Sequence, residues 1–247
     1  MRISTPNIRP AGIDHVLMRY SNLIRLRRQW AVTWAVCQGV SLERHHGPLT
    51  TNMRVIAGKF RSRPLRSIRG LDIRPTADRL RETLFNVLIA GNPQALQGSV
   101  WVDLFAGTGA VGIEALSRGA REVHFVESSK SAVEAIRKNL QSLAITEGIE
   151  IWQEELPRAL WRMERQKVTV DVVFLDPPYR MKKAYSETLQ ALAKSSLIGA
   201  MSVVIAEHEK KFDPGEEIGT LRRFRLLVQG DAALSFYRLS GSGEPHT

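Results

Sequence analysis

The chain has 247 residues, of which 43% are hydrophobic and 24% charged, values typical of a soluble globular protein. This composition excludes an intrinsically disordered, collagen-like or fibrous chain, and the length suffices for one or two domains with a buried core. The single cysteine, Cys37, excludes an internal disulfide and a paired-cysteine zinc site, so we expect a protein of the reducing cytoplasm.

The net charge of +10 is concentrated in the N-terminal third of the chain. Residues 1–52 carry seven Lys or Arg against two acids, and residues 53–82 carry nine against three. Residues 83–247 are almost neutral, with nineteen basic and twenty acidic residues. Because Lys and Arg release counterions from phosphate, this asymmetry favours a protein that binds a polyanion. A solvated basic surface without a partner is the alternative.

Residues 1–52 contain no motif that carries chemistry. The apolar segment 30–40 has eleven residues, too few to span a bilayer, and no cleavage site follows it. We therefore expect no membrane association. A regular pattern begins only at Met53, so the first 52 residues are expected to be dispensable for chemistry. They are either a basic extension that adds non-specific affinity or sequence upstream of the true translation start.

From Met53 the pattern predicts a small basic β-hairpin over residues 53–74, followed by a helix. Val55-Ile56 and Leu65–Ile68 are typical of two short strands on either side of Gly58 and a basic turn. Thr76 can cap a helix whose apolar residues recur at helical spacing until Gly91-Asn92-Pro93 stops it. Those apolar residues are Leu80, Leu84, Val87 and Leu88.

Beyond residue 99, strands and helices alternate. Strands are predicted over 100–104, 123–126, 149–152, 170–175 and 201–206, with helices over 111–118, 132–143, 157–163 and 185–193. Strands over 224–228 and 233–239, joined by Gly230-Asp231, form a C-terminal antiparallel hairpin. The fold class is therefore α/β: a Rossmann-like, mostly parallel sheet with helices on both faces. Such sheets bind ligands at the carboxyl ends of their strands. The main domain covers 75–240, and 241–247 form a frayed tail.

The first predicted strand of this domain leads into a glycine-rich turn, DLFAGTGAVG, over residues 103–112. A G-x-G-x-x-G pattern between strand and helix, with Glu127 ending the next strand, predicts a cofactor that contains adenosine. An acid at Asp103 repels a diphosphate but suits a cofactor with an ammonium and a sulfonium. The turn resembles the S-adenosylmethionine loop of class I methyltransferases. Its cofactor-binding candidates are Asp103, Phe105, Gly107, Gly109 and Glu127.

The second motif, Asp176-Pro177-Pro178-Tyr179, directly follows the apolar strand over 170–175. An exocyclic amine of a base is a poor nucleophile because its lone pair is delocalised into the ring. The Asp176 carboxylate and the Pro177 carbonyl can accept its N–H bonds and direct the lone pair to a sulfonium methyl. Pro178 stiffens the turn, and Tyr179 offers a ring for an extruded base. These four residues are the catalytic candidates, with no metal and no covalent enzyme intermediate. A proline-stiffened strand exit is the alternative.

Over residues 53–239 the chain resembles the bacterial methyltransferases that modify the N2 of a guanine in 16S ribosomal RNA, of the guanine-966 type. The matching segments are MRVIAGKFRSRPL, RPTADRLRETLFNVL, VDLFAGTGAVGIEALSRGA, DPPY and LSFYRL. The resemblance implies a cytoplasmic, monomeric enzyme that transfers methyl from S-adenosylmethionine to 16S rRNA or a small-subunit assembly intermediate. It also implies that the basic hairpin contacts RNA, through Lys59, Arg61, Arg63 and Arg66. The RNA-binding candidates that follow the hairpin are expected beside the cofactor and the target base: Arg74, Thr76, Arg79 and Asn86.

Two positions depart from this family. Glu155-Leu156 stands where such enzymes carry Asp or Asn followed by Ala, and Glu155 is expected to accept from the adenine amine of the cofactor. Gln229 precedes Gly230 where a tyrosine is usual. Glu207-His208-Glu209 lies at a strand end and could border the pocket, but we interpret it as a solvated charge run. Two other functions stay open: a DNA methyltransferase acting on adenine N6 or cytosine N4, and a non-catalytic RNA-binding assembly protein.

Overall fold

The computed structural model describes residues 53–67, 75–178 and 180–241. The predicted extension over 1–52, Arg74, Tyr179 and most of the tail lie outside the described residues, and Thr76 is described by its backbone alone. Among the described helices, none combines the length and the apolar character that a membrane crossing requires.

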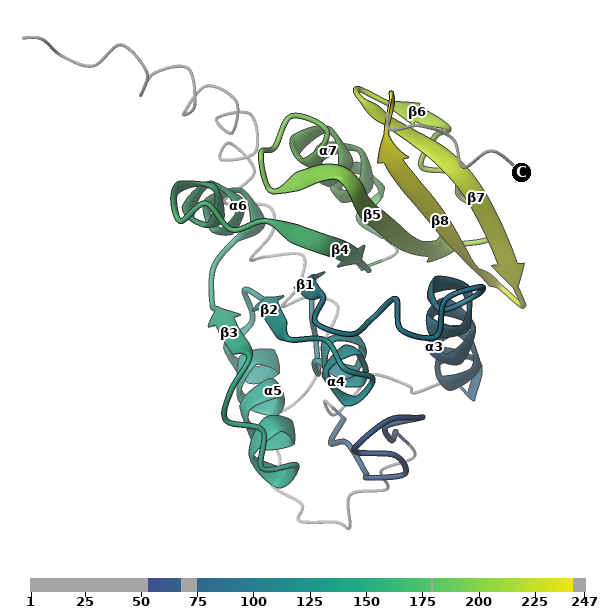
Figure 1. Ribbon diagram of the computed structural model, residues 1–247. Helices are drawn as coiled ribbons and strands as arrows, with labels where there is room; N and C mark the ends of the chain where they lie inside the picture. The colour runs from purple at the N-terminus through teal and green to yellow at the C-terminus, as the bar shows by residue number, and fades with distance from the viewer. Residues whose placement is uncertain (1–52, 68–74, 179, 242–247) are drawn as a thin grey trace, which may run out of the picture. The chain divides into compact units, whose positions relative to one another are not determined.

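One eight-stranded sheet organises the described part of the chain (Figure 1). Its order is β3-β2-β1-β4-β5-β8-β7-β6. The first five strands in this order pair in parallel, and β8, β7 and β6 continue the sheet with antiparallel pairs. The predicted sheet and its C-terminal antiparallel hairpin are confirmed. The strands are β1 (Val100–Leu104), β2 (Glu122–Val126), β3 (Ile149–Trp152), β4 (Val170–Leu175), β5 (Ile198–Glu209), β6 (Glu217–Ile218), β7 (Leu221–Gln229) and β8 (Ala232–Leu239).

Helices cover both faces of this sheet. Figure 1 shows α3, α4 and α5 on one side of it and α6 and α7 on the other. The core under the first group includes Trp101, Phe125 and Phe174, all buried. The described helices are α3 (Pro75–Leu88), α4 (Ala110–Ser117), α5 (Lys130–Ser142), α6 (Leu156–Arg165) and α7 (Lys182–Leu192).

The strands β1, β3 and β4 have the predicted bounds, since each is a short apolar run between turn residues. Strand β5 is longer than the predicted 201–206. Antiparallel β8 pairs with it as far as Glu209, so the sheet continues beyond the last parallel pair, Leu175 with Ala206. This extension brings Glu207 into the sheet.

The two strands predicted for the basic hairpin are wrong within the described residues 53–67. The two arms pair antiparallel over a short stretch only, through one isolated bridge between Arg54 and Pro64 and the backbone hydrogen bonds from Val55 to Arg63 and from Leu65 to Met53, instead of a ladder of two strands. Gly58 and Ser62 take left-handed conformations with φ of 81° and 65°, and Pro64 has no N–H to donate. We call residues 53–67 the basic loop.

Thr76 is not the cap of α3. The helix begins at Pro75, so Thr76 lies inside its first turn rather than before it. A proline at the start of a helix needs no partner for a missing N–H, and its fixed φ already suits the helical backbone. The predicted helix itself is confirmed, with Leu80 and Leu84 buried.

Candidate active site

Four acidic residues gather where the parallel strands end. Asp103 lies on β1, Glu127 follows β2, Asp176 follows β4, and Glu207 lies near the end of β5. Because these strands are parallel neighbours, their carboxyl ends meet at one edge of the sheet. We call this region the carboxylate edge.

Asp103, which pairs with Phe174, points to the same face of the sheet as Asp176 and Glu207. Side chains alternate along a strand, so Asp176 shares the face of Phe174, and Glu207 shares that of Ile205. Phe174 and Ile205 belong to the core that includes the α3 residues Leu80 and Leu84. Asp176 and Glu207 therefore lie side by side, facing α3.

Asp103 holds the glycine turn against β1. Its Oδ2 accepts the Gly112 N–H at 2.9 Å, and the side chain is buried. Burial raises the pKa of Asp103 to about 8; the Gly112 N–H opposes this rise, and the Asp176 and Glu127 charges add to it. The neighbourhood of Asp103 is therefore one that a cation would stabilise.

The glycines of the turn have two different roles. A Cβ on Gly112 would lie 2.4 Å from the Phe125 ring, and one on Gly109 would lie 3.2 Å from it, so both allow close packing. A Cβ on Gly107 would meet only the Phe105 carbonyl, at 3.9 Å. Phe105 itself has a positive φ of 60°. The expectation that these glycines admit a ligand therefore fits Gly107, whereas Gly109 and Gly112 serve the contact between helix and sheet.

Glu127 is fixed by the backbone at both of its carboxylate oxygens. Oε2 accepts the Gly107 N–H at 3.0 Å, and Oε1 accepts the Ser129 N–H at 2.8 Å. Burial raises the pKa of Glu127, although these N–H groups oppose the rise. Each oxygen can accept more than one hydrogen bond, so the carboxylate is oriented and can still accept ribose hydroxyls.

Asp176 opens the motif that follows β4. Burial raises its pKa to about 7. The next residue, Pro177, is buried, and its carbonyl lies 3.2 Å from the Tyr185 hydroxyl of α7. The same hydroxyl lies 2.9 Å from the Glu207 carbonyl, so Tyr185 ties the motif to β5. Sequence reasoning did not identify Tyr185, which reads as an ordinary core position of α7.

The interpretation of Glu207-His208-Glu209 as a solvated charge run is wrong for two of the three residues. His208 is buried, with Nε2 2.9 Å from the Ser235 hydroxyl. Glu207 is half-buried, and its pKa is raised by burial and by the Asp176 charge and lowered by Arg81. Only Glu209 is exposed. The sequence around Glu207 carries no local signal for this position, because its place beside Asp176 depends on the pairing of Leu175 with Ala206.

Arg81 of α3 is the buried cation of this region. Its Nη2 donates to the Arg54 carbonyl at 2.6 Å and to Asp78 at 3.0 Å. Its Nε has no hydrogen-bond partner among the described residues and lies 4.0 Å from a carboxylate oxygen of Glu114. Burial lowers the pKa of Arg81, while Asp78, Glu114 and Glu207 oppose this change.

The basic loop is attached to α4 and α5 through its backbone. The buried Glu114 accepts the N–H groups of Ile56 and Ala57 at 2.7 and 2.9 Å. Ser117 accepts the Phe60 N–H at 2.9 Å, and Asn139 accepts the Arg66 N–H at 2.7 Å. These four backbone N–H groups therefore bind the helices instead of extending the pairing between the two arms of the loop. The predicted RNA-binding residues Lys59, Arg61, Arg63 and Arg66 are left exposed.

The remaining predicted residues lie on exposed surfaces. Arg79 and Asn86 are exposed on α3, and their contact with a base stays a prediction. Glu155 is the N-cap residue of α6 but makes no side-chain cap, and it is exposed. Its neighbour Glu154 is the more buried acid and pairs with Arg162. Cofactor binding by Glu155 also stays a prediction.

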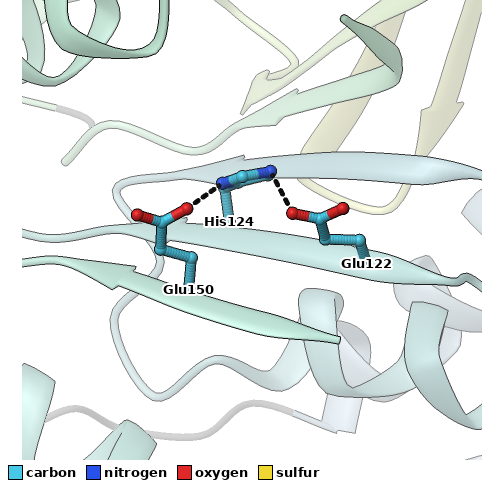
Figure 2. A group of neighbouring side chains, drawn as sticks. All are labelled: Glu122, His124 and Glu150. Atoms are coloured by element: carbon cyan, nitrogen blue, oxygen red, sulfur yellow. Dashed lines mark ion pairs between the residues drawn. The ribbon is translucent and has the colours of Figure 1, made fainter. Parts of the chain in front are cut away.

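A histidine and two glutamates join β2 to β3 away from the carboxylate edge. Figure 2 shows Glu122 and Glu150 at opposite nitrogens of the His124 ring, with ion-pair distances of 3.1 and 3.2 Å. Trp152 Nε1 also lies 3.2 Å from His124 Nδ1. Burial lowers the pKa of His124, and the two glutamates oppose this change. These contacts occupy both ring nitrogens, and we interpret the group as a link between strands.

Comparison with known proteins places the described domain in a family. The family model described as conserved hypothetical protein 95 matches residues 53–238. The ribosomal RNA small subunit methyltransferase D of Haemophilus influenzae is 34% identical over 188 residues, which cover 76% of this chain and 92% of the relative. The protein of the same name from Escherichia coli is 29% identical over 78% of this chain and 92% of its own length.

A solved structure has the same fold. The hypothetical protein TTHA0928 of Thermus thermophilus superposes with a TM-score of 0.62 at 26% identity, covering 74% of this chain and 98% of its own.

Proposed function

The chain belongs to the family described as conserved hypothetical protein 95, and we propose that it methylates the N2 of a guanine in 16S rRNA, of the guanine-966 type. The methyl donor is S-adenosylmethionine. One observation carries this proposal: the glycine turn follows β1 and the Asp176 motif follows β4, and these two strands are parallel neighbours in the sheet. The relatives are small-subunit rRNA methyltransferases, which supports an RNA substrate.

The carboxylate edge suits a cationic cofactor. Asp103 is buried, and burial together with its acidic neighbours raises its pKa to about 8, so a cation placed nearby would favour its ionised form. Gly107 gives the backbone room beside the turn, and Glu127 presents an oriented carboxylate to ribose hydroxyls. An ammonium and a sulfonium are the charges that such a site accepts, whereas it repels a diphosphate.

Asp176 and Pro177 act on the amine that receives the methyl group. Asp176 accepts one N2–H bond, and the Pro177 carbonyl accepts the other through the lone pair that Tyr185 leaves free. The lone pair of N2 is then directed at the methyl carbon. The N2–C bond forms as the sulfur–carbon bond breaks, and one N2 proton is released. The protein's contribution is orientation and electrostatic stabilisation of the amine as it gains positive charge.

The basic loop binds the phosphates around the target nucleotide. It is held to α5 next to the glycine turn, since Asn139 of α5 donates to both the Arg66 and Thr108 carbonyls. The partner is 16S rRNA or a small-subunit assembly intermediate, which places the enzyme in the cytoplasm. Exposed Lys59 and Arg61 supply charge without reading the sequence of the RNA.

The test is transfer of a labelled methyl group from S-adenosylmethionine to three substrates side by side. These are naked small-subunit RNA, small-subunit particles and duplex DNA, each followed by nucleoside analysis. We expect N2-methylguanosine from RNA or from particles. N6-methyladenine or N4-methylcytosine from DNA supports the DNA alternative instead. RNA binding without transfer to any substrate supports the non-catalytic alternative.

A further inference from the structure

We propose that Glu207 selects guanine, by accepting the N1–H of the target base while Asp176 holds the adjacent N2 amine. The inference rests on the proposed function and names the residue that would give it base specificity. Glu207 belongs to the segment that the sequence pattern assigned to solvent.

The geometry begins with the register of β4 and β5. Leu175 pairs with Ala206, so Asp176 and Glu207 follow at the same level on neighbouring strands, about 4.8 Å apart along the pairing direction. Tyr185 fixes this juxtaposition, because its hydroxyl lies within hydrogen-bond distance of both the Pro177 and Glu207 carbonyls. Two carboxylates thus face α3 side by side at the point where the target amine is expected.

A pair of carboxylates distinguishes guanine from the other bases that carry an exocyclic amine. Beside the N2 amine, guanine has a second donor, N1–H. Beside the N6 amine of adenine lies the acceptor N1, and beside the N4 amine of cytosine lies the acceptor N3. A carboxylate at this position therefore accepts a hydrogen bond from guanine but meets a lone pair on adenine or cytosine, which costs affinity.

Arg81 provides the charge that balances this second carboxylate. It is buried on the face of α3 that packs on the sheet, and its positive charge stabilises the ionised form of Glu207. The Nε without a hydrogen-bond partner in the described residues shows that its charge is only partly compensated by Asp78 and Glu114. Burial and the Asp176 charge raise the pKa of Glu207, so the free protein disfavours two charges at this pair. The two donors of guanine favour the form in which both Asp176 and Glu207 are ionised.

The experiment compares two target nucleotides in otherwise identical RNA. Small-subunit RNA is assembled by splinted ligation with either guanine or 2-aminopurine at the methylated position, and is supplied within particles where naked RNA is inactive. 2-Aminopurine keeps the 2-amino group but has an unprotonated N1. We expect the wild-type protein to favour guanine in kcat/KM by about 10- to 100-fold. Glu207→Gln, whose amide can donate to N1, should lose most of this preference.

Three controls separate specificity from damage to the fold. Glu209→Gln changes the exposed acid two residues along β5 and should keep the wild-type preference. Glu207→Asp keeps the charge and should retain the preference at a lower rate. Measurements of thermal unfolding and of S-adenosylmethionine affinity identify a variant that has lost its structure. If Glu207→Gln does so, the guanine to 2-aminopurine ratio of the wild type and of Glu207→Asp still tests whether Glu207 selects guanine.

Two results would overturn the inference. One is an equal kcat/KM of the wild type on guanine and on 2-aminopurine, and the other is a Glu207→Gln variant whose kcat/KM falls by the same factor on both nucleotides. Methylation of DNA amines instead of guanine would contradict the proposed function itself, which is a different outcome.

Discussion

The basic loop and the carboxylate edge are neighbouring regions with opposite designs. The loop exposes its basic side chains to solvent, while several of its backbone N–H groups donate hydrogen bonds to the buried side chains of Glu114, Ser117 and Asn139. The edge exposes little and keeps like charges together, so that burial raises the pKa values of Asp103, Asp176 and Glu207. Exposed cations change the free energy of folding little, whereas clustered, buried carboxylates lower the stability of the protein until a ligand compensates their charge.

Removing the anchor of the basic loop should have the largest effect. Glu114→Gln leaves the partly buried Arg118 guanidinium, 2.7 Å from the carboxylate, without its counter-charge and weakens the bonds to Ile56 and Ala57. We expect a loss of about 3–5 kcal/mol in the free energy of unfolding, measured by urea denaturation. Glu134→Gln is the matched control: its pair with Lys138 is half-exposed and 3.9 Å long, so the loss should stay below about 1 kcal/mol. Similar losses in both variants would show that the anchor is not Glu114.

At the carboxylate edge, Asp176→Asn should abolish turnover and spare the cofactor. Asp176 acts on the amine as it gains charge, so single-turnover rates should fall by about 100- to 1000-fold. Calorimetry should give an affinity for S-adenosylmethionine close to that of the wild type. A variant that transfers methyl at nearly the normal rate would refute the role of Asp176.

Cofactor binding should depend on Asp103 and on pH. Asp103→Ala removes a charge-assisted acceptor and should weaken S-adenosylmethionine binding by about 10- to 100-fold, with Glu127→Ala in the same range. The pKa of Asp103 is about 8 without ligand, so binding of a cation at pH 7 should release protons. Calorimetry in buffers of different ionisation enthalpy measures that release. Proton uptake, or tight binding of NAD, would contradict the assignment.

The raised pKa of Asp103 also determines whether the stability of the protein rises or falls with pH. An acid whose pKa is raised by folding stabilises the protein at low pH and loses that contribution as pH rises through the folded value. The ligand-free protein should therefore become less stable between about pH 4, where these acids titrate in the unfolded chain, and pH 8, because folding raises the pKa of Asp103 to about 8 and that of Asp176 to about 7. Glu207 and Glu127, whose pKa values burial also raises, face these groups and contribute to the slope, while the Arg81 charge opposes the rise in the pKa of Glu207. Asp103→Asn should flatten the profile in urea titrations at each pH, and a stability that rises with pH would refute this reading.

Sequence reasoning identified the strands and site residues that are set by neighbouring positions in the chain, and it missed those whose role depends on residues far away in the sequence. The bounds of β1, β3 and β4 follow from local apolar runs, and Asp103 and Asp176 were found because each sits in a motif. Glu114 was missed because its partners, Ile56 and Ala57, lie 58 and 57 residues away. Glu207 was misread because only the pairing of β5 with β4 shows which acid it faces.

The smallest expected effects concern the exposed cations of the basic loop. Lys59, Arg61, Arg63 and Arg66 should bind phosphates, so replacing each with Gln should weaken RNA binding for all sequences and lower the salt slope by roughly one unit per contact. Lys59 and Arg61 are the cleaner tests, because Arg63 also donates to the Ser142 carbonyl at 2.9 Å. Lys194→Gln, exposed just beyond α7, is the control and should leave the slope unchanged. Filter binding between about 50 and 200 mM salt, a range over which phosphate contacts change affinity strongly, measures the slope. A slope that these changes leave intact would move the RNA-binding surface away from the basic loop, most directly to residues 1–52, whose seven basic residues outnumber their two acids.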